Sequence, residues 1–428
     1  MHEHGGGTMG VRFGYLPVAS VLADDPATVE RIVGPYGPLL EDAGGTRLGS
    51  IEEAGELPVA FFVVTGGTEG IVLGAVEQLR SRGVVDPVLL IAHPSNNSLP
   101  ASLETLARLQ RDGSAGRVVY LGGPADDAGR RTLAEAAEGV AVARVLAGAR
   151  VGRVGEPSDW LVASMPDAQT VRSSWGPELV DVPIARLFDA VAATPDAAAL
   201  AEADRLRTGA RACVEPTEHD LLEAGRVVAA LRGIVREDDL DALTVRCFDL
   251  VLRSRTTGCA ALAALIDEGV IAGCEGDVPS TIAMLWAQHL VGATPWMANP
   301  ARVDEQGQEI VLAHCTVPLS IVESYRLRSH FESGLGVGIQ GAMPLGPVTL
   351  VRIGGAMLER AWIAEGEIVA TGEAEDLCRT QVTVRVDDGD LGELLRAPLG
   401  NHLVVVRGRH ATRFRAWHDM VRPGAGAA

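Results

Sequence analysis

The chain has 428 residues, 47% hydrophobic and 22% charged, which is typical of a folded protein of two or three domains. Its formal net charge of −19, from 37 basic and 56 acidic residues, argues against binding to nucleic acid or to an anionic membrane surface. Lysine is absent, which excludes Schiff-base chemistry, a pyridoxal-phosphate lysine and a Walker phosphate lysine.

The N-terminal segment MHEHGGGTMG lacks the charged and apolar regions of a secretory signal. No apolar run approaches the roughly 18–20 residues of a membrane-spanning helix. The six cysteines form no C-x-x-C pair, and several lie in apolar runs that suit reduced, buried thiols. We therefore expect a cytoplasmic protein without a membrane span.

Short apolar runs alternate with amphipathic stretches in the first third of the chain. The pattern predicts strands at 11–19, 58–65, 87–93 and 117–122, and helices at 70–82 and 101–111. Such βαβ alternation predicts a parallel sheet covered on both faces. The loop 65–70 directly follows a strand, where open α/β sheets bind ligands. We expect an N-terminal Rossmann-like domain over residues 1–152.

A second α/β domain is expected over residues 153–316. A strand is predicted at 161–164 and long helices near 190–210 and 218–236, after which strands at 243–252 and 270–274 alternate with helices at 257–268 and 280–291. From residue 317 the runs at 348–353, 361–371, 381–386 and 402–407 are β-like, with a short helix at 391–396. The predicted fold is therefore α/β, with two Rossmann-like parallel-sheet domains followed by a smaller, mostly β C-terminal domain over 317–428.

The segment Val270-Ile-Ala-Gly-Cys-Glu-Gly-Asp-Val-Pro-Ser280 carries the most chemical information. Glu275 ends a buried strand, where a charge is costly unless it is paired or bound to a metal. It is either a metal ligand or proton-transfer base, or an exposed carboxylate at a strand end. Asp277 stands two residues before Pro279, which favours a helix N-cap.

The interpretation of two histidines, His314 and His402, depends on whether they lie close to Glu275. His314 lies beside Cys315 on a predicted strand, so the two side chains point to opposite faces and are not expected to share a metal. A lone strand histidine is typical of a core residue unless Glu275 and His402 converge on it. Carboxylate, amide and imidazole together suit Mn²⁺ or Mg²⁺.

The segment 336–341 matches G-x-G-x-x-G, but a turn and a strand follow it, so it is not a dinucleotide fingerprint. Just before it, His330 and Glu332 are two residues apart and either line a site or form a surface pair. Neither G-x-S-x-G nor H-E-x-x-H is present, which disfavours an α/β-hydrolase or a zincin.

Taken together, the chain resembles the L-fucose isomerase and L-arabinose isomerase superfamily. The resemblance rests on GEPSDW (155–160), TVRCFD (244–249), TTGCAALAALIDEG (256–269), AGCEGDVPSTIAM (272–284), AHCTVP (313–318), RSHFESGLGVGIQG (328–341) and GNHLVVVRG (400–408). It implies an aldose–ketose isomerase that acts through a cis-enediol with a divalent cation, usually Mn²⁺. It also implies a homo-oligomer, often a hexamer with sites between subunits, whose partner molecule is a small sugar.

The resemblance places the metal on Glu275, His314 and His402, with Glu275 also the candidate base. Asn299 stands where a second acidic ligand is expected; it can bind the metal through its carbonyl oxygen, but an amide cannot act as a base near pH 7. Asp304 is the candidate replacement. The implied substrate-side residues are Trp160, Arg246, Glu69 and His330.

Three functions follow from these patterns. The first is a metal-dependent ketol isomerase of a sugar or sugar derivative. The second, suggested by Asn299, is another metal-assisted carbohydrate enzyme, an epimerase or a lyase. The third is a non-catalytic sugar-binding protein, because a fold does not fix a function.

Overall fold

The computed structural model describes residues 12–422. The chain divides into two compact units, one within residues 1–145 and 416–428 and the other within 146–415. The N-terminal segment on which the expectation about a secretory signal rests lies outside the described residues.

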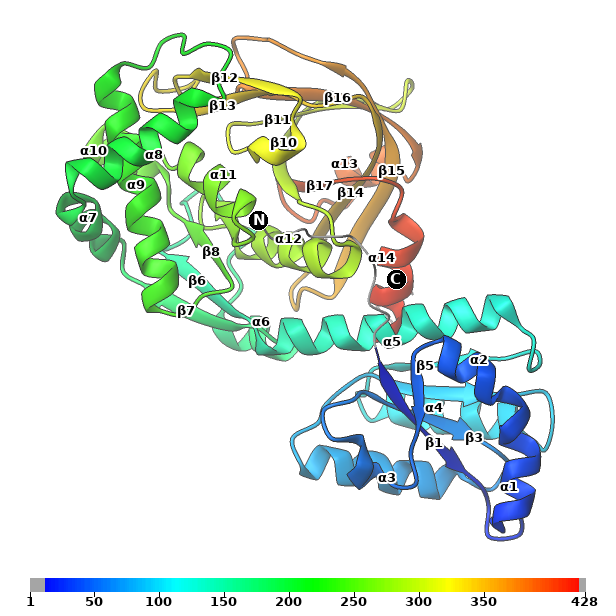
Figure 1. Cartoon of the computed structure of the whole chain (residues 1–428). Coiled ribbons are helices and arrows are strands. Elements are labelled where there is room, and N and C mark those ends of the chain that lie inside the picture. Colours follow the sequence, from blue (N-terminus) through cyan, green and yellow to red (C-terminus); the bar gives the residue numbers. More distant parts are fainter. Residues whose placement is uncertain (1–11, 423–428) are drawn as a thin grey trace. The chain divides into compact units, whose positions relative to one another are not determined.

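The first unit contains a five-stranded parallel sheet with the strand order β2-β1-β3-β4-β5 (Figure 1). Strands β3 and β4 are buried along their whole length, as expected for strands covered on both faces. The elements are β1 (Phe13–Val18), α1 (Pro26–Val33), η1 (Gly34–Tyr36), α2 (Gly37–Asp42), β2 (Gly45–Arg47), η2 (Ile51–Ala54), β3 (Val59–Val63), α3 (Glu69–Ser81), β4 (Val88–Ala92), α4 (Ser98–Arg111), β5 (Gly116–Tyr120) and α5 (Asp127–Gly148).

The second unit begins with a four-stranded parallel sheet with the order β7-β6-β8-β9. Its elements are β6 (Arg150–Val154), α6 (Ala168–Ser174), β7 (Glu178–Val182), α7 (Ile184–Ala193), α8 (Asp196–Thr208), α9 (Glu218–Glu237), β8 (Ala242–Val245), α10 (Phe248–Ser254), α11 (Cys259–Asp267), β9 (Ile271–Cys274) and α12 (Val278–Val291). Together with the first sheet, it confirms the predicted pair of parallel-sheet α/β regions.

Two predicted strands of this region are wrong. Residues 161–164 form turns, and the sheet takes β6 instead, ten residues earlier. The predicted strand 243–252 is strand β8 followed by helix α10, with Cys247 at the helix N-cap. A continuous apolar run does not by itself distinguish a buried strand from a buried helix.

The rest of the second unit is rich in β-structure, which confirms the predicted third part of the fold. Six antiparallel strands close a barrel in the order β10-β11-β16-β15-β14-β17, and β12 and β13 form a hairpin. The barrel takes β10 and β11 from the range expected for the second α/β domain. The elements are β10 (Trp296–Asp304), β11 (Glu309–His314), η3 (Leu319–Ile321), β12 (Ser324–Arg328), β13 (Gly338–Ala342), β14 (Gly346–Gly354), β15 (Arg360–Thr371), β16 (Thr380–Asp388), α13 (Leu391–Arg396) and β17 (Leu403–Arg407). The last helix, α14 (Ala411–Val421), begins in the second unit, and its residues from 416 on belong to the first.

Helix α12 joins the parallel sheet to the barrel. It contacts β8 and β9 of the sheet and β10, β14 and β17 of the barrel, and almost all of its side chains are buried. A helix that is apolar on all sides suits a position between two layers. Its N-terminus therefore lies where the sheet and the barrel meet, and this is where the candidate site is built.

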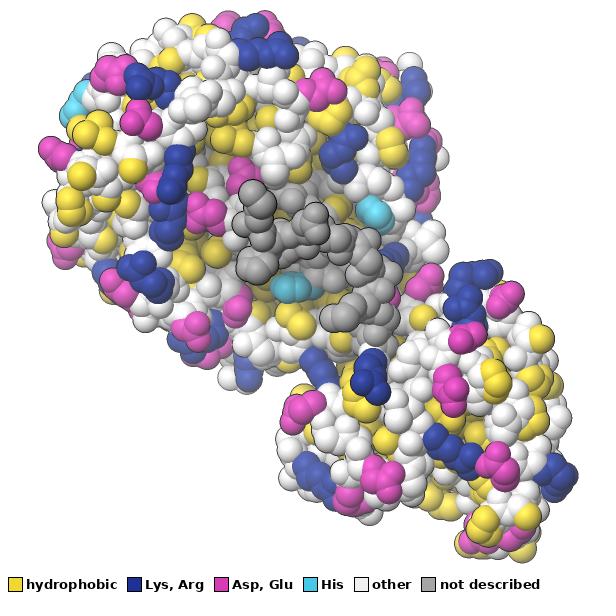
Figure 2. Space-filling model, viewed as in Figure 1, with side chains coloured by type: hydrophobic (Ala, Val, Ile, Leu, Met, Phe, Trp, Pro, Cys, Tyr) yellow, Lys and Arg dark blue, Asp and Glu magenta, His cyan; other side chains and the backbone are white. Residues whose placement is uncertain are grey.

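Arginine and acidic side chains are interspersed over the visible face of the molecule (Figure 2). Many form ion pairs, such as Arg232 with Glu268 and Arg409 with Asp387. Among the described residues, every helix is too short or too polar to cross a membrane.

Helix α9 offers a matched test of how closely α8 and α9 pack. A Cβ at Gly225 would lie 2.1 Å from the Ala199 carbonyl oxygen, whereas one at Gly233 on the same helix meets nothing within 4 Å. We expect Gly225→Ala to lower the free energy of unfolding by about 1–3 kcal/mol through overpacking. We expect Gly233→Ala to raise it by about 0.5–1 kcal/mol. Urea unfolding measures both, and equal shifts in the two variants would contradict the close contact.

Candidate metal centre and the cavity beside it

Glu275 lies on a tight turn at the carboxyl end of β9. Its φ of +64° is left-handed, and Gly276 follows with φ +77°. A Cβ at Gly276 would lie 2.6 Å from Cα of Pro157, so the turn accepts only glycine there. A left-handed conformation is rare for a non-glycine residue and is found at functional sites. The turn leaves Glu275 8% exposed.

His402 lies between two carboxylates, just before strand β17. Its Nδ1 is 2.9 Å from Oδ2 of Asp277, and its Nε2 is 3.6 Å from Oε1 of Glu275. The side chain is fully buried, and within residues 12–422 its Nε2 has no hydrogen-bond partner. An orphaned buried nitrogen that faces a carboxylate is the arrangement that a metal ion completes.

Asp277 is the N-cap of α12, as predicted from the proline that follows it. It also accepts hydrogen bonds from Ser280 and, at 3.0 Å, from the guanidinium of Arg352 on β14. Arg352 is fully buried and also bonds to the Ser164 hydroxyl at 2.6 Å and to the Leu399 carbonyl. Asp277 thus fixes the ring of His402 and leaves its Nε2 directed at Glu275.

His314, the last residue of β11, completes the group. Its Nδ1 is 2.9 Å from the hydroxyl of Thr316, and its ring centroid lies 5.5 Å from that of His402. One ligand atom from each of Glu275, His314 and His402 lies within 4.8 Å of the other two, and all three side chains are buried. Glu275 and His402 therefore do converge on His314, the condition under which His314 is more than a core histidine.

The protonation of these groups follows from their burial and their partners. Burial disfavours the charged form of His402, but its hydrogen bond to Asp277 and the negative charges of Asp277 and Glu275 outweigh burial and raise its pKa to about 9. Burial and the charge of His402 lower the pKa of His314 to about 4. Burial raises the pKa of Glu275, but His402 and Trp160 outweigh it and hold that pKa below the ordinary value. One imidazole is thus charged and one neutral at neutral pH.

A cavity of about 440 Å³, within the size range of small-molecule sites, is lined by Glu275 and His314. Its wall is mainly aromatic, aliphatic and sulfur-bearing. The lining residues are Trp160, Cys247, Phe248, Val251, Thr257, Gly258, Cys259, Cys274, Glu275, Asn299, Ala301, Ala313, His314, Cys315, His330, Phe331, Glu332, Leu377, Cys378 and Asn401.

Three further predicted residues belong to this neighbourhood, in different ways. Trp160 lines the cavity and donates from Nε1 to Oε2 of Glu275 at 2.6 Å. Asn299, on β10, lines it next to Asn401. Arg246 is absent from the lining, because its guanidinium bonds to Asp249, Asp159 and the Pro157 carbonyl. It holds the turn that carries Trp160.

Two predicted residues lie elsewhere. Asp304 is the last residue of β10, where its carboxylate accepts from the backbone N–H groups of Gln306 and Gly307 in the turn that follows, each at 3.0 Å. It lies outside the cavity lining. Glu69 is the first residue of α3 and belongs to the first unit.

His330 is buried and lines the cavity, whereas its neighbour Glu332 is exposed. The two residues lie on a loop after β12, where the surface-pair alternative does not hold for His330. Its ring contacts Phe248 edge to face, with centroids 5.5 Å apart. The sequence alone does not decide between a site-lining pair and a surface pair, because side chains on a loop do not follow the alternation of a strand.

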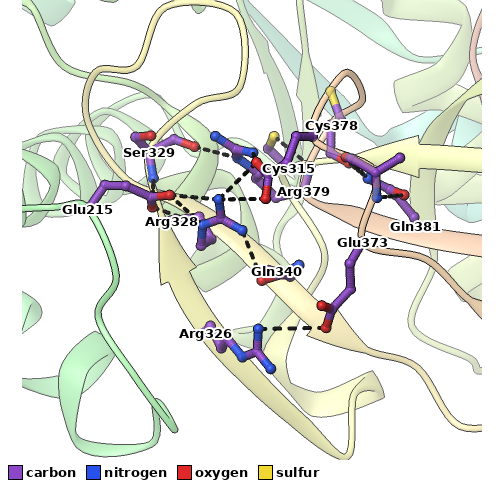
Figure 3. A network of polar contacts seen from close by, with 12 residues as sticks. Glu215, Cys315, Arg326, Arg328, Ser329, Gln340, Glu373, Cys378, Arg379 and Gln381 are labelled. Atoms are coloured by element: carbon purple, nitrogen blue, oxygen red, sulfur yellow. Dashed lines mark hydrogen bonds and ion pairs between the residues drawn. The ribbon is translucent and has the colours of Figure 1, made fainter.

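A network of ion pairs anchors that loop (Figure 3). Arg328 contacts Glu215 at 2.6 Å and Glu375 at 3.0 Å, Glu215 accepts from the N–H of Ser329, and Arg379 donates to the Ser329 carbonyl. Both arginine side chains are at least nine-tenths buried. Local sequence patterns do not predict this network, because its members come from three distant parts of the sequence.

Arg352 is a further residue of the site that local sequence patterns do not predict. Its signal is an arginine inside the apolar run of β14, where a buried cation requires an acidic partner. The partner, Asp277, lies 75 residues away in the chain.

The chain matches none of the protein-family models. It is 20% identical to the sulfoquinovose isomerases of Priestia aryabhattai and Priestia megaterium over 196 residues, which is 45% of this chain and 44% of each relative. It is 27% identical to the sulfoquinovose isomerase of Clostridium sp. (strain MSTE9) over 124 residues, 28% of this chain and 26% of the relative. The chain thus matches less than half the length of these curated relatives.

The raised pKa of His402 predicts an alkaline loss of stability in the metal-free protein. A histidine of pKa about 9 in the folded chain and about 6.5 in the unfolded chain stabilises the fold fully below pH 6.5. This stabilisation, about 3 kcal/mol, is lost as the pH rises through 9. We expect urea unfolding in chelator to show a smaller loss between pH 6.5 and 9.5 in His402→Gln than in the wild type.

The matched control is His410→Gln, which changes a partly exposed histidine on the same unit and should keep the wild-type slope. His314 acts on the acid side, since its lowered pKa gives stability that is lost as the pH falls through 4. An alkaline slope that is identical in His402→Gln and the wild type would contradict the assignment.

Proposed function

We propose that the chain is a metal-dependent aldose–ketose isomerase that acts on a sugar or sugar derivative. The observation that carries the proposal is the meeting of Glu275, His314 and His402 at the edge of a cavity of about 440 Å³. The similarity to sulfoquinovose isomerases supports it, because their name describes the isomerisation of a sugar derivative.

The donor set suits Mn²⁺ or another divalent cation. It offers one carboxylate and two imidazoles, and the buried Nε2 of His402 lacks any other partner. When bound, such an ion supplies polarisation of the substrate carbonyl and the neighbouring hydroxyl. Asp277 would keep His402 oriented through Nδ1, as carboxylates do behind metal-bound histidines.

Isomerisation through a cis-enediol moves one proton from C2 to C1 and another from O2 to O1. We assign the carbon-bound proton to Glu275, whose carboxylate faces the cavity and has a lowered pKa that keeps it ionised. Burial and the hydrogen bond from Trp160 orient its Oε2. The apolar wall of the cavity would exclude bulk water from the reacting carbons.

The proton on oxygen needs a carrier other than Asn299. An amide does not titrate near neutral pH, and Asp304, the last residue of β10, lies outside the cavity lining. His330 lines the same cavity, and an imidazole both accepts and donates protons. We therefore assign this role to His330.

Asn299 also favours a second function. With an amide in place of a carboxylate, Glu275 and the metal alone would support removal and return of a proton next to a carbonyl, which is the chemistry of an epimerase or a lyase. Exchange of solvent deuterium into a ketose without formation of an aldose would favour this function. Assembly into a homo-oligomer stays a prediction.

The test is a screen of pentoses, hexoses and their deoxy and sulfonated forms, with purified protein and Mn²⁺. We expect turnover of at least one sugar, its loss on chelation, and its recovery with Mn²⁺. Glu275→Gln should lower kcat by about 10²–10⁴-fold, the contribution of a positioned base. The matched control is Glu323→Gln, an exposed glutamate on the same unit.

Wild-type turnover in Glu275→Gln would rule out Glu275 as the base. Sugar-induced thermal stabilisation without turnover, with or without the metal, would indicate a sugar-binding protein. Absence of Mn²⁺ binding, measured by calorimetry on the chelated protein, would contradict the metal site itself.

A further inference from the structure

The cavity beside the candidate metal centre is lined by five of the six cysteines of the chain. They are Cys247, Cys259, Cys274, Cys315 and Cys378, and all are free thiols. The assigned chemistry uses none of them. A buried cysteine ordinarily packs as a small apolar side chain, and its role usually depends on its reactivity. Five thiols around one cavity therefore call for an explanation beyond packing.

Two of these thiols are in direct contact. Sγ of Cys247 lies 2.9 Å from Sγ of Cys274, and the residues are 5% and 3% exposed. A disulfide bond is about 2.05 Å long, so the two sulfur atoms need to approach by about 0.9 Å.

The backbone holds this pair in place. Cys274 ends β9, whose neighbour β8 pairs Val245 with Cys274. Cys247 follows β8 by two residues and caps α10. The N–H of Cys247 bonds to the Val245 carbonyl at 2.8 Å, and the N–H of Cys274 donates to Sδ of Met297 at 3.1 Å. The contact between the thiols is thus a consequence of the sheet register.

We propose that Cys247 and Cys274 form an oxidisable dithiol that a hydroperoxide converts into a disulfide within the cavity. The peroxide O–O bond is reduced as one thiol becomes a sulfenic acid and one water leaves. The second thiol then attacks that sulfur, the S–S bond forms, and a second water leaves. Two thiols and one hydrogen peroxide thus give one disulfide and two waters, and an added dithiol reverses the change.

The other three thiols that line the cavity are the alternative candidates for disulfide formation. Cys315 lies near both Cys259 and Cys378 and accepts the N–H of Arg379 at 3.4 Å (Figure 3). The direct sulfur contact at 2.9 Å favours Cys247 and Cys274 as the first pair to close.

Oxidation should reach the metal centre, a consequence that rests on the proposed function. Cys274 is joined by its peptide bond to Glu275, which already has a strained φ. Drawing the Cys274 sulfur towards Cys247 would shift the Glu275 carboxylate. Changes in groups that support metal ligands lower metal affinity by about 10–100-fold, and we expect a rise of at least tenfold in the Kd for Mn²⁺.

The experiment uses the full chain, treated with hydrogen peroxide and digested after Arg and Glu. This digestion places each cysteine in a peptide of its own, including 247–253 for Cys247 and 269–275 for Cys274. Mass spectrometry should find these two peptides linked, with a loss of two hydrogens that dithiothreitol reverses. Their absence as a linked pair, or prior linkage of Cys315 to Cys259 or Cys378, would overturn the proposal.

Two variants test whether the effect of peroxide on Mn²⁺ binding requires the Cys247–Cys274 dithiol. In Cys247→Ser, peroxide should leave the Mn²⁺ Kd within twofold, whereas Cys213→Ser, which removes the exposed cysteine, should behave as the wild type. An unchanged Kd in the linked wild type would refute the coupling to Glu275. If the reduced protein binds no Mn²⁺, the proposed function fails while the peptide map still decides the dithiol.

Discussion

A buried chain of charges governs the candidate site. Arg352, Asp277, His402 and Glu275 follow one another at 3.0, 2.9 and 3.6 Å, and each is less than a tenth exposed. With His402 protonated, two positive and two negative charges balance. With His402 neutral, one negative charge is left in a medium that penalises net charge. A proton on His402 restores the balance, and the proposed metal ion would compete with that proton for Nε2.

The architecture explains why these residues meet. The carboxyl end of β9 supplies Glu275, the N-terminus of α12 supplies Asp277, and the barrel strands β11 and β14 supply His314 and Arg352. Helix α12 packs against both the parallel sheet and the barrel. The site thus uses the usual ligand position of a parallel sheet, but the barrel provides most of the nitrogen donors. Neither half alone contains the three proposed ligands.

Local patterns in the sequence predict part of this arrangement. The strand end at Glu275 and the proline after Asp277 are readable within a few residues, and the structure places both residues as those patterns indicate. Arg352 and His330 depend on contacts between segments far apart in the chain, which no local period encodes. The predicted strand over 243–252 fails for a related reason, since its apolar residues continue from β8 into α10 and a short apolar run does not by itself separate strand from helix.

The same register that builds the site also creates its thiol contact. Parallel pairing of β8 with β9 sets Val245 beside Cys274, and the turn after each strand then directs Cys247 and Glu275 to one end of the sheet. The chain cannot keep Glu275 on this tight turn without also keeping the preceding cysteine beside Cys247. A carboxylate at the candidate metal site and a thiol that faces another thiol are therefore two results of one backbone geometry. The substitution Cys247→Ser would remove the thiol contact but keep the position of Glu275, because it removes one sulfur atom and leaves the strand pairing unchanged.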